Sequence, residues 1–577
     1  MNNDSIIMRK YRQYLLPSIL TSLALALNEF VDCMLVSNML GGDALAIANM
    51  ACPVILVIAA CYVLLGTGGS ILYAACLGKW DNEKAGKIFT LSIALSIITG
   101  FVFIIAGLVL KGPVTAFLCA DGSLRAEFTQ YYSVLLFMAP VLIFMLTYVC
   151  FLPPSGAPVV ATVANIVANG SNLLFDIIYI KFFHTGVKGA AYATISGYLA
   201  GIIVMFILVK NKKVKIAKSR IGRSDIRLIR TILVYGIPTA MLQVCFAIKY
   251  AFSNNMAAMY GGRTGIIAFS LCLQTFSIAS VFLLGVCDTA QPLLAMLSGQ
   301  KDYKGERLVL KRSFVLQVIF ACALIGLFEL NPGAMAKMYG VDDSDVLAIA
   351  LTGIRIFTLT YLPRGICIQF MRFFQVEGRK LYAFLISLMD GFLVIPAGLI
   401  LCKNMGVNGI FAAYPLTAFI ALAVICVINI IIFVRNRDEY AGLSLIRRDS
   451  GALGKISFTI RDDDEDISRA SEEMIDFGTE HGLSMKEANK LGLLCEEMAV
   501  YTRTHRKDTG DIDIILRIGK DDMVIDFRSS GAPFDPTKAT DEDLEENVMM
   551  LSAVASDIAY DYIMGMNSTR ITVLRRQ

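Results

Sequence analysis

Histidine and tryptophan are scarce in this chain of 577 residues, which contains three histidines and one tryptophan. The histidines, His184, His481 and His505, do not form a ligand cluster, and the 14 cysteines are scattered, mostly within apolar runs, without paired spacing. We therefore expect small buried cysteines, with neither a disulfide framework nor a metal site. Charged residues are also few, at 17% against 56% hydrophobic residues, and this composition excludes an ordinary soluble protein.

Long apolar runs recur up to about residue 435. Each is long enough to cross ~30 Å of hydrocarbon, which takes ~20 helical residues. We count about twelve of them, six in each half of that region. The sequence thus predicts an all-α polytopic membrane protein.

The first 440 residues contain the same pattern twice, about 221 positions apart. The paired segments are Tyr14–Pro17 with Tyr235–Pro238, Gly78–Asp81 with Gly299–Asp302, and Thr185–Gly189 with Met405–Gly409. Glycines and prolines recur by chance in any membrane protein, but three pairs in the same order favour a duplication. We predict an N-terminal lobe over 1–220 and a C-terminal lobe over 221–440.

Charge divides the chain into a basic and an acidic part. Residues 451–577 carry 15 Lys and Arg but 26 Asp and Glu, whereas the remainder carries 37 and 22. This change predicts a further domain over 441–577. Loops rich in Lys and Arg fall on one side of the predicted bundle, which indicates a plasma-membrane protein with both termini in the cytoplasm. The most basic loop, 210–230, is expected at anionic lipid headgroups and not on nucleic acid.

Polar residues inside the apolar runs of the first half mark a candidate cation site. Four of them, at positions 165, 169, 172 and 176, step by four, three and four, so they share one helical face that must point into the bundle. Two carboxylates with amide oxygens suit Na⁺, and desolvated carboxylates could instead carry a proton. The alternative role of the asparagines is hydrogen bonding between helices. The set predicted to couple the cation is Asp32, Asn169, Asn172, Asp176 and Thr194.

The second half carries different charges at membrane depth. We assign Lys249, Asp288, Gln291 and Asp390 to a substrate cavity. Because charges in the membrane tend to pair, Lys249 could neutralise Asp288 or Asp390 as an internal ion pair, or it could shape the cavity.

An ordered set of motifs over residues 10–435 resembles the multidrug and toxic compound extrusion (MATE) family. The motifs are Val31–Val36, Leu40–Ala46, Gly66–Ser70, Ala75–Gly78, Asn172–Asp176, Gly186–Ala190 and Ala290–Pro292. The resemblance implies two six-helix lobes around a central cavity, with export driven by inward Na⁺ or H⁺. It also implies that Asp32, Asn172, Asp176 and Thr194 occupy the family's cation site. The sequence departs from the pattern at Lys249, where some members carry an acidic residue, and a buried lysine repels cationic substrates.

The acidic region predicts a small α/β domain. We expect strands at 455–461, 511–518, 522–528 and 569–575, and helices at 466–482 and 485–505. Two segments, Glu496–His505 and Ser529–Pro536, resemble the histidine-kinase-like ATPase domain of anti-sigma-factor serine kinases.

The nucleotide contacts that this second resemblance implies are degenerate. Glu497 matches, but Tyr501 replaces the Mg²⁺-binding asparagine, and Ser529 replaces the adenine-binding aspartate two residues before Gly531. The expected glycine-rich lid, near 547–553, contains no glycine. We expect a regulatory module that binds a cytoplasmic signalling protein; an active kinase is the alternative.

The sequence therefore favours a transporter over an enzyme, without catalytic residues or a cofactor beyond the coupling Na⁺ or H⁺. The leading interpretation is an antiporter that exports small amphipathic, cationic compounds across the bilayer. The alternatives are a flippase for a lipid or lipid-linked saccharide, which an opening lined by Arg355 and Arg364 would favour, and a membrane-tethered regulator with vestigial transport.

Overall fold

The computed structural model describes residues 6–40, 42–119, 125–333, 344–448, 453–461, 463–505, 510–537 and 546–575. They form two compact units. One comprises Tyr14–Pro154 and Pro158–Ile432, and the other comprises Met1–Gln13, Ser155–Ala157 and Phe433–Gln577. Each unit is described by itself below.

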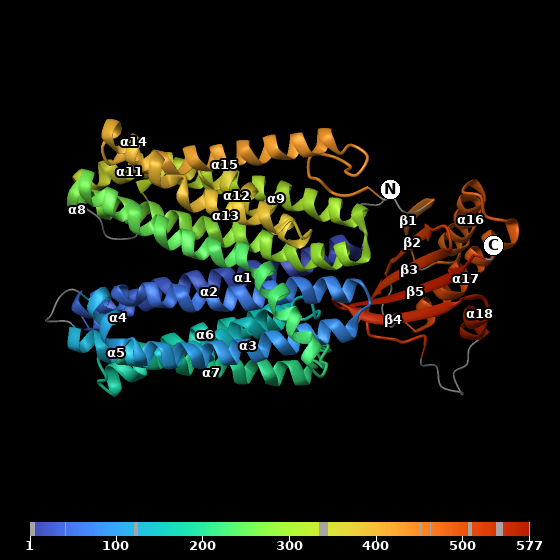
Figure 1. Cartoon of the computed structure of the whole chain (residues 1–577), viewed down its shortest axis with the longest axis horizontal. Helices are drawn as coiled ribbons and strands as arrows, with labels where there is room; N and C mark the ends of the chain where they lie inside the picture. The colour runs from blue at the N-terminus through green and yellow to red at the C-terminus, as the bar shows by residue number, and fades with distance from the viewer. Residues whose placement is uncertain are drawn as a thin grey trace. The chain divides into compact units, whose positions relative to one another are not determined.

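Helices build the first unit, and they form two bundles that follow each other along the chain (Figure 1). The first bundle consists of α1 (Ile6–Leu40), α2 (Gly42–Gly78), α3 (Asn82–Val109), α4 (Lys111–Leu118), α5 (Arg125–Phe151), α6 (Pro158–Ile177), the π-helical turn η1 (Ile178–Phe182) and α7 (Val187–Asn211). The second consists of η2 (Arg223–Ile226), α8 (Arg227–Gln300), α9 (Tyr303–Leu330), α11 (Ser344–Thr358), α12 (Tyr361–Val376), α13 (Lys380–Phe392), α14 (Val394–Met405) and α15 (Asn408–Arg435).

Among the described residues, nine helices are long and apolar enough to cross a membrane, or ten if the bent pair Val346–Thr358 and Tyr361–Val376 is one span. The 74 residues of α8 enter this count once, although the chain turns at Gly262. Gly262 adopts φ 55°, a left-handed conformation that suits glycine because it has no Cβ. A polytopic helical protein is thus confirmed, and the number twelve stays a prediction.

The turns of the two bundles repeat each other in conformation. Asp81 and Asp302 cap α3 and α9 with φ −97° and −88°, and each carboxylate accepts a backbone N–H three residues on. Gly186 and Gly406 precede α7 and α15 with φ 62° and 59°. Because these residues belong to the anchor pairs found in the sequence, the local structure supports a duplication.

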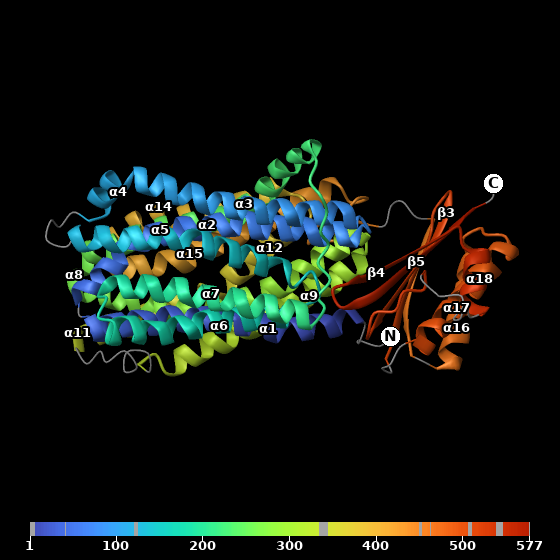
Figure 2. The same cartoon turned by 90° about the horizontal axis from the view of Figure 1, so that it is seen from below.

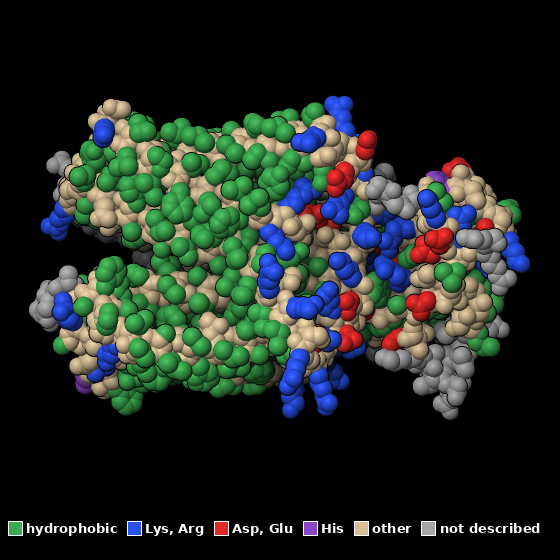
Figure 3. Space-filling model, viewed as in Figure 1, with side chains coloured by type: hydrophobic (Ala, Val, Ile, Leu, Met, Phe, Trp, Pro, Cys, Tyr) green, Lys and Arg blue, Asp and Glu red, His purple; other side chains and the backbone are tan. Residues whose placement is uncertain are grey.

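The two bundles touch most closely through glycines of α2 and α8. A Cβ at Gly68, Gly78, Gly236 or Gly299 would collide with a backbone carbonyl oxygen of the facing helix. Such close backbone approach needs small residues. Gly78 and Gly299 lie at the ends of α2 and α8 that lead into the basic turns at Lys79 and Lys301, and Gly236 lies near the start of α8, which follows the basic loop 210–230. Figure 3 shows a cleft between the bundles at the opposite end of this unit.

A five-stranded antiparallel sheet forms the centre of the second unit, in the order β1-β2-β3-β5-β4. The strands are β1 (Gly454–Ile460), β2 (Ile512–Ile518), β3 (Asp522–Ser530), β4 (Asp557–Ile563) and β5 (Met566–Leu574). The helices α16 (Asp464–Glu480), α17 (Met485–His505) and α18 (Glu546–Val554) lie on one face of it (Figures 1 and 2). Every predicted strand and helix is present, and β4 and α18 are additional.

Candidate functional site

The polar stripe on α6 lies inside the first bundle. Asn165, Asn169, Asn172 and Asp176 are each at most 5% exposed, although α6 belongs to an apolar bundle. The prediction that this face points into the bundle is therefore confirmed. Asp176 is fully buried and stands two residues before η1. Single π-helical turns inside α-helices are frequent at functional sites, and the sequence did not reveal this one.

Two acidic side chains from different helices meet beside this stripe. The carboxyl group of Asp32 on α1 lies next to that of Asp176 on α6. Both oxygens of Asp176 and one oxygen of Asp32 are buried and accept no hydrogen bond from the described residues. Two adjacent carboxylates without a donor repel each other, so the arrangement requires a proton or a bound cation.

Oxygen atoms of neighbouring residues complete this candidate cation site. The Asn172 amide donates to the hydroxyl of Thr194 on α7 over 3.3 Å, and α7 reaches that position because Gly197 packs against Asn172. The side-chain oxygen of Asn28, one turn before Asp32, is buried without a partner among the described residues. The sequence analysis did not assign Asn28, because position alone does not show that the face of α1 that carries it is the inner one.

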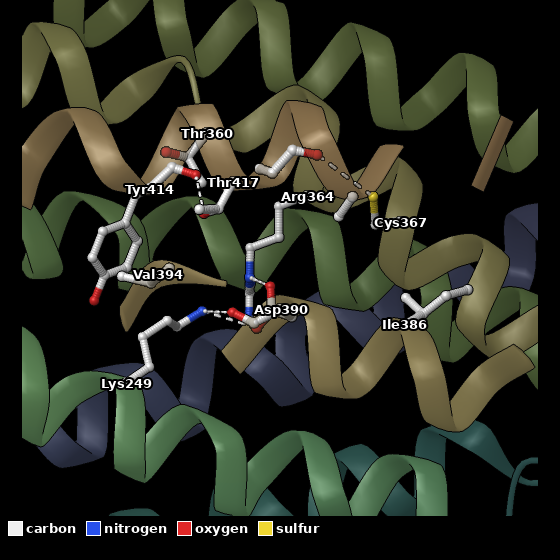
Figure 4. A pocket seen from close by; sticks show the side chains of 11 residues that line it. Lys249, Thr360, Arg364, Cys367, Ile386, Asp390, Val394, Tyr414 and Thr417 are labelled. Atoms are coloured by element: carbon white, nitrogen blue, oxygen red, sulfur yellow. Dashed lines mark hydrogen bonds and ion pairs between the residues drawn. The ribbon is translucent and has the colours of Figure 1, made fainter. Parts of the chain in front are cut away.

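The second bundle contains a cluster of three charged groups, in which two cations surround one carboxylate (Figure 4). Lys249 Nζ lies 2.9 Å from Asp390 Oδ2, and Arg364 Nε lies 2.8 Å from Asp390 Oδ1. These side chains are 2%, 9% and 12% exposed for Lys249, Arg364 and Asp390. The internal ion pair between Lys249 and Asp390 is therefore present, with Arg364, which the sequence analysis considered only for a lateral opening, as a second cation.

A small pocket borders this charge cluster. It is lined by Lys249, Thr360, Arg364, Cys367, Ile386, Asp390, Val394, Tyr414, Thr417, Ala418 and Ala421. Its free space holds about one or two water molecules. The pocket therefore has charged and hydroxyl groups on one part of its wall and apolar side chains on another.

Asp288 and Gln291 belong to a different cluster, so the four residues assigned to one cavity must be divided. Arg372 donates hydrogen bonds to Asp288 over 3.2 Å and to Gln291 over 3.0 Å. The Gln291 amide in turn donates a hydrogen bond to Gln375. The two clusters are separate because the chain turns at Gly262. Lys249 lies on the segment of α8 before this turn, and Asp288 lies on the segment after it. The sequence analysis did not assign Arg372, whose only sequence signal is its place in an apolar run.

Arg355 and Arg364 do not line a common opening. The Arg364 side chain is buried against Asp390, whereas the Arg355 side chain is 61% exposed and lies 4.0 Å from Glu329. The feature that would have favoured a flippase is therefore not present between these two residues.

In the second unit, aromatic rings occupy the place of the degenerate nucleotide motif. Glu497 and Tyr501 lie on α17, Ser529 is the last residue but one of β3, and Gly531 directly follows the strand. The Tyr501 ring is 3% exposed, stacks on His505 at 4.0 Å between centroids, and lies 6.0 Å from Phe534, just beyond Gly531. The structure thus brings the two motif segments together, with packed rings between them.

The first turns of α1 are part of this second unit. The Ile6 backbone N–H donates to Asp513 Oδ2 over 3.1 Å, Arg9 pairs with Asp511 over 2.7 Å, and Lys10 Nζ donates to the Gly565 carbonyl over 2.8 Å. Burial, with a contribution from the charge of Arg9, lowers the pKa of Lys10 to about 8. Since an undocked Lys10 keeps its proton to higher pH, this contact strengthens as the pH rises above 8.

The loop between α5 and α6 also enters this unit. Gly156 adopts φ 82°, and a Cβ there would collide with the backbone at Met564 and Gly565. The β4–β5 turn of the sheet, which carries Met564 and Gly565, therefore contacts both Lys10 and Gly156.

Comparison with known proteins identifies the first unit. The MatE family model matches residues 17–178 and again residues 238–400, together more than half of the chain. The chain belongs to the MatE family. The double match, with residue 17 of the first repeat equivalent to residue 238 of the second, confirms the duplication at the predicted spacing.

Relatives of this MatE family member are multidrug transporters. It is 22% identical over 390 residues to the multidrug export protein MepA of Staphylococcus aureus strain MSSA476, covering 67% of this chain and 85% of MepA. MepA of Staphylococcus haemolyticus strain JCSC1435 is 22% identical over 450 residues, or 77% of this chain and 97% of that protein. A solved structure of a mutant of the Vibrio cholerae MATE transporter VcmN matches with a TM-score of 0.68 at 19% identity, covering 76% of this chain and 98% of that one. The family assignment points to a multi-pass membrane transporter rather than an enzyme over the matched residues.

Proposed function

We propose that this MatE family member exports small organic compounds in exchange for Na⁺ or H⁺. The observation that carries the proposal is the pair of adjacent carboxyl groups of Asp32 and Asp176, of which both Asp176 oxygens and one Asp32 oxygen are buried without a hydrogen-bond partner among the described residues. The relatives that are multidrug export proteins support drug-like compounds as substrates. The cationic character of those compounds, expected from the sequence, stays a prediction.

The two bundles supply the two states that antiport requires. If the basic end faces the cytoplasm, as the loop charges predict, the cleft in Figure 3 opens to the outside. A cation entering from outside would bind between α1 and α6 and favour a state with lower affinity for the exported compound. Antiport depends on this difference in affinity, because a cation that bound both states equally would drive nothing.

Dye efflux from everted membrane vesicles tests this function. With ethidium as the dye, an imposed Na⁺ gradient or an imposed pH gradient should each be tried alone, and we expect one of them to drive transport. The gradient that works identifies the coupling ion. Absence of transport under both gradients would contradict the proposed gradient-driven export.

The relatives do not favour the two alternatives raised by the sequence. Both curated relatives named above are export proteins, and neither is described as a flippase or a regulator. The adjacent carboxyl groups at membrane depth also argue against vestigial transport, because buried charges are costly to keep.

For residues 441–577 we propose a regulatory role that depends on protein contacts and not on ATP. The Tyr501 ring packs where the resemblance requires the Mg²⁺-binding asparagine, and its neighbours His505 and Phe534 are also aromatic. The contacts with residues 6–10 and Gly156 give such a domain a direct link to α1 and to the loop before α6. These are the two helices that carry Asp32 and Asp176.

Charge reversal at Arg9 tests this regulatory link. In Arg9→Glu the new carboxylate faces Asp511, so we expect the segment to undock and the rate of efflux to change about fivefold or more, the lower end of common coupling energies. Arg9→Glu combined with Asp511→Arg should restore the wild-type rate, and Lys520→Glu, an exposed charge reversal in the same domain, should leave it unchanged. An unchanged rate in Arg9→Glu would show that the domain does not regulate transport through this contact.

A further inference from the structure

The repeat places two intramembrane sites at equivalent positions of the two bundles. The paired family matches start at residues 17 and 238, and this offset of 221 residues relates Asn28 on α1 to Lys249 on α8. The first site lies among α1, α6 and α7, and the second lies among α8, α12, α13 and α15. The same position in the two bundles therefore holds different chemistry.

The two sites have opposite charge. The first brings together two carboxyl groups, Asp32 and Asp176. The second brings the cations Lys249 and Arg364 to the single carboxylate of Asp390 (Figure 4). Within the described residues, the charged groups that act on Asp390 are these same two cations. Because both cations share this one carboxylate, the second site carries a formal excess of one positive charge.

Neighbouring aromatic rings reduce this excess charge only in part. Lys249 Nζ lies 5.4 Å from the centre of the Tyr414 ring, and the Arg364 guanidinium lies 4.6 Å from that of Phe276. Rings stabilise a cation through their quadrupole but add no negative charge. A net charge at membrane depth remains costly, so a partner anion would stabilise the site.

The pocket beside the cluster offers groups that suit an anion. Arg364 directs Nε and one terminal nitrogen at Asp390, whereas its Nη1 has no hydrogen-bond partner among the described residues. Thr360, a residue 1% exposed, lines the same pocket, and its hydroxyl has no hydrogen-bond partner among the described residues. Ile386, Val394 and Ala421 supply apolar wall.

We propose that this pocket binds a carboxylate carried by the exported compound, with Lys249 and Arg364 as its cationic partners and the Thr360 hydroxyl as a donor. The inference extends the proposed export function by naming a substrate class, namely organic acids and zwitterions. The apolar wall holds the carbon skeleton next to the carboxylate. The room for about one or two waters fits the head of such a group.

Binding of a matched acid and ester tests this inference without any ion gradient. The probes are dansylglycine and its methyl ester, which differ in the negative charge, and the protein is the full chain in nanodiscs. We expect the acid to bind about tenfold or more tightly than the ester, the size of one hydrogen bond between charged groups. Lys249→Gln should bring the ratio close to one, and Lys249→Arg should retain most of it. Lys403→Gln, which removes an exposed lysine of the same bundle, should keep the wild-type ratio.

The outcomes separate this inference from the export function. A wild-type ratio near one, binding of neither probe, or an unchanged ratio in Lys249→Gln would overturn the carboxylate site and leave ion-driven dye efflux untouched. Failure of efflux with a high acid-to-ester ratio would reject the antiport and keep the site. If chloride displaces dansylglycine from the wild type, the pocket binds an inorganic anion and the proposal is wrong. If dansylglycine stays bound in the presence of chloride, the result supports the proposal.

Discussion

Replacing Asp32 or Asp176 by asparagine should abolish gradient-driven efflux while the protein stays folded. The side chains of aspartate and asparagine have nearly the same shape, so packing between α1 and α6 is retained. The amide can neither exchange a proton near neutral pH nor attract Na⁺ with a full negative charge. We expect the rate to fall at least about tenfold in each variant, since even 1.4 kcal/mol of lost coupling has that effect. The measurement is dye efflux from everted vesicles under the gradient that drives the wild type.

The matched control for these variants removes a carboxylate elsewhere. Asp438, an exposed residue after α15, should tolerate Asp438→Asn without loss of efflux. If the two carboxyl groups act as one site, the double variant Asp32→Asn with Asp176→Asn should be no slower than either single variant. Efflux at the wild-type rate in either single variant would contradict a shared cation site.

Asp390→Asn should destabilise the second bundle more than any other single change in its charge cluster. The substitution leaves Lys249 and Arg364 side by side, both less than 10% exposed, without a carboxylate between them. Removing one partner of a buried ion pair typically costs about 3–5 kcal/mol, because an uncompensated buried charge remains. We expect a drop of several degrees in the apparent unfolding temperature of the purified protein.

A second substitution shows whether charge is the cause. Adding Lys249→Met to Asp390→Asn restores the net charge of the wild-type cluster and should recover most of the lost stability. Glu439→Gln removes one partner of an exposed pair with Arg447 and should change the stability by less than about 1 kcal/mol. An Asp390→Asn protein as stable as the wild type would mean that the cluster is solvated and not buried.

Local patterns in the sequence were sufficient to predict the order of the main structural elements along the chain. The apolar runs predicted the helical membrane unit, and the spaced anchors predicted the repeat that the double family match confirms. Four polar residues on one face of a helix predicted their burial, because a helix has a fixed period and lipid does not accept polar groups. In the acidic domain, the edge strand β4 was missed although Ile558, Tyr560 and Tyr562 alternate with small and polar residues as in a half-buried strand.

The tertiary structure decided which side chains meet. Lys249 could have paired with Asp288 or Asp390, and the choice depended on the turn at Gly262 and on Arg364 arriving from α12. Asp32 lies next to Asp176 although 144 residues separate them in the sequence. The sequence by itself determined periodicity, span length and total charge, since each depends on residues close together in the chain. Pairing between helices depends on how their faces are rotated toward one another, and only the packed bundle determines that.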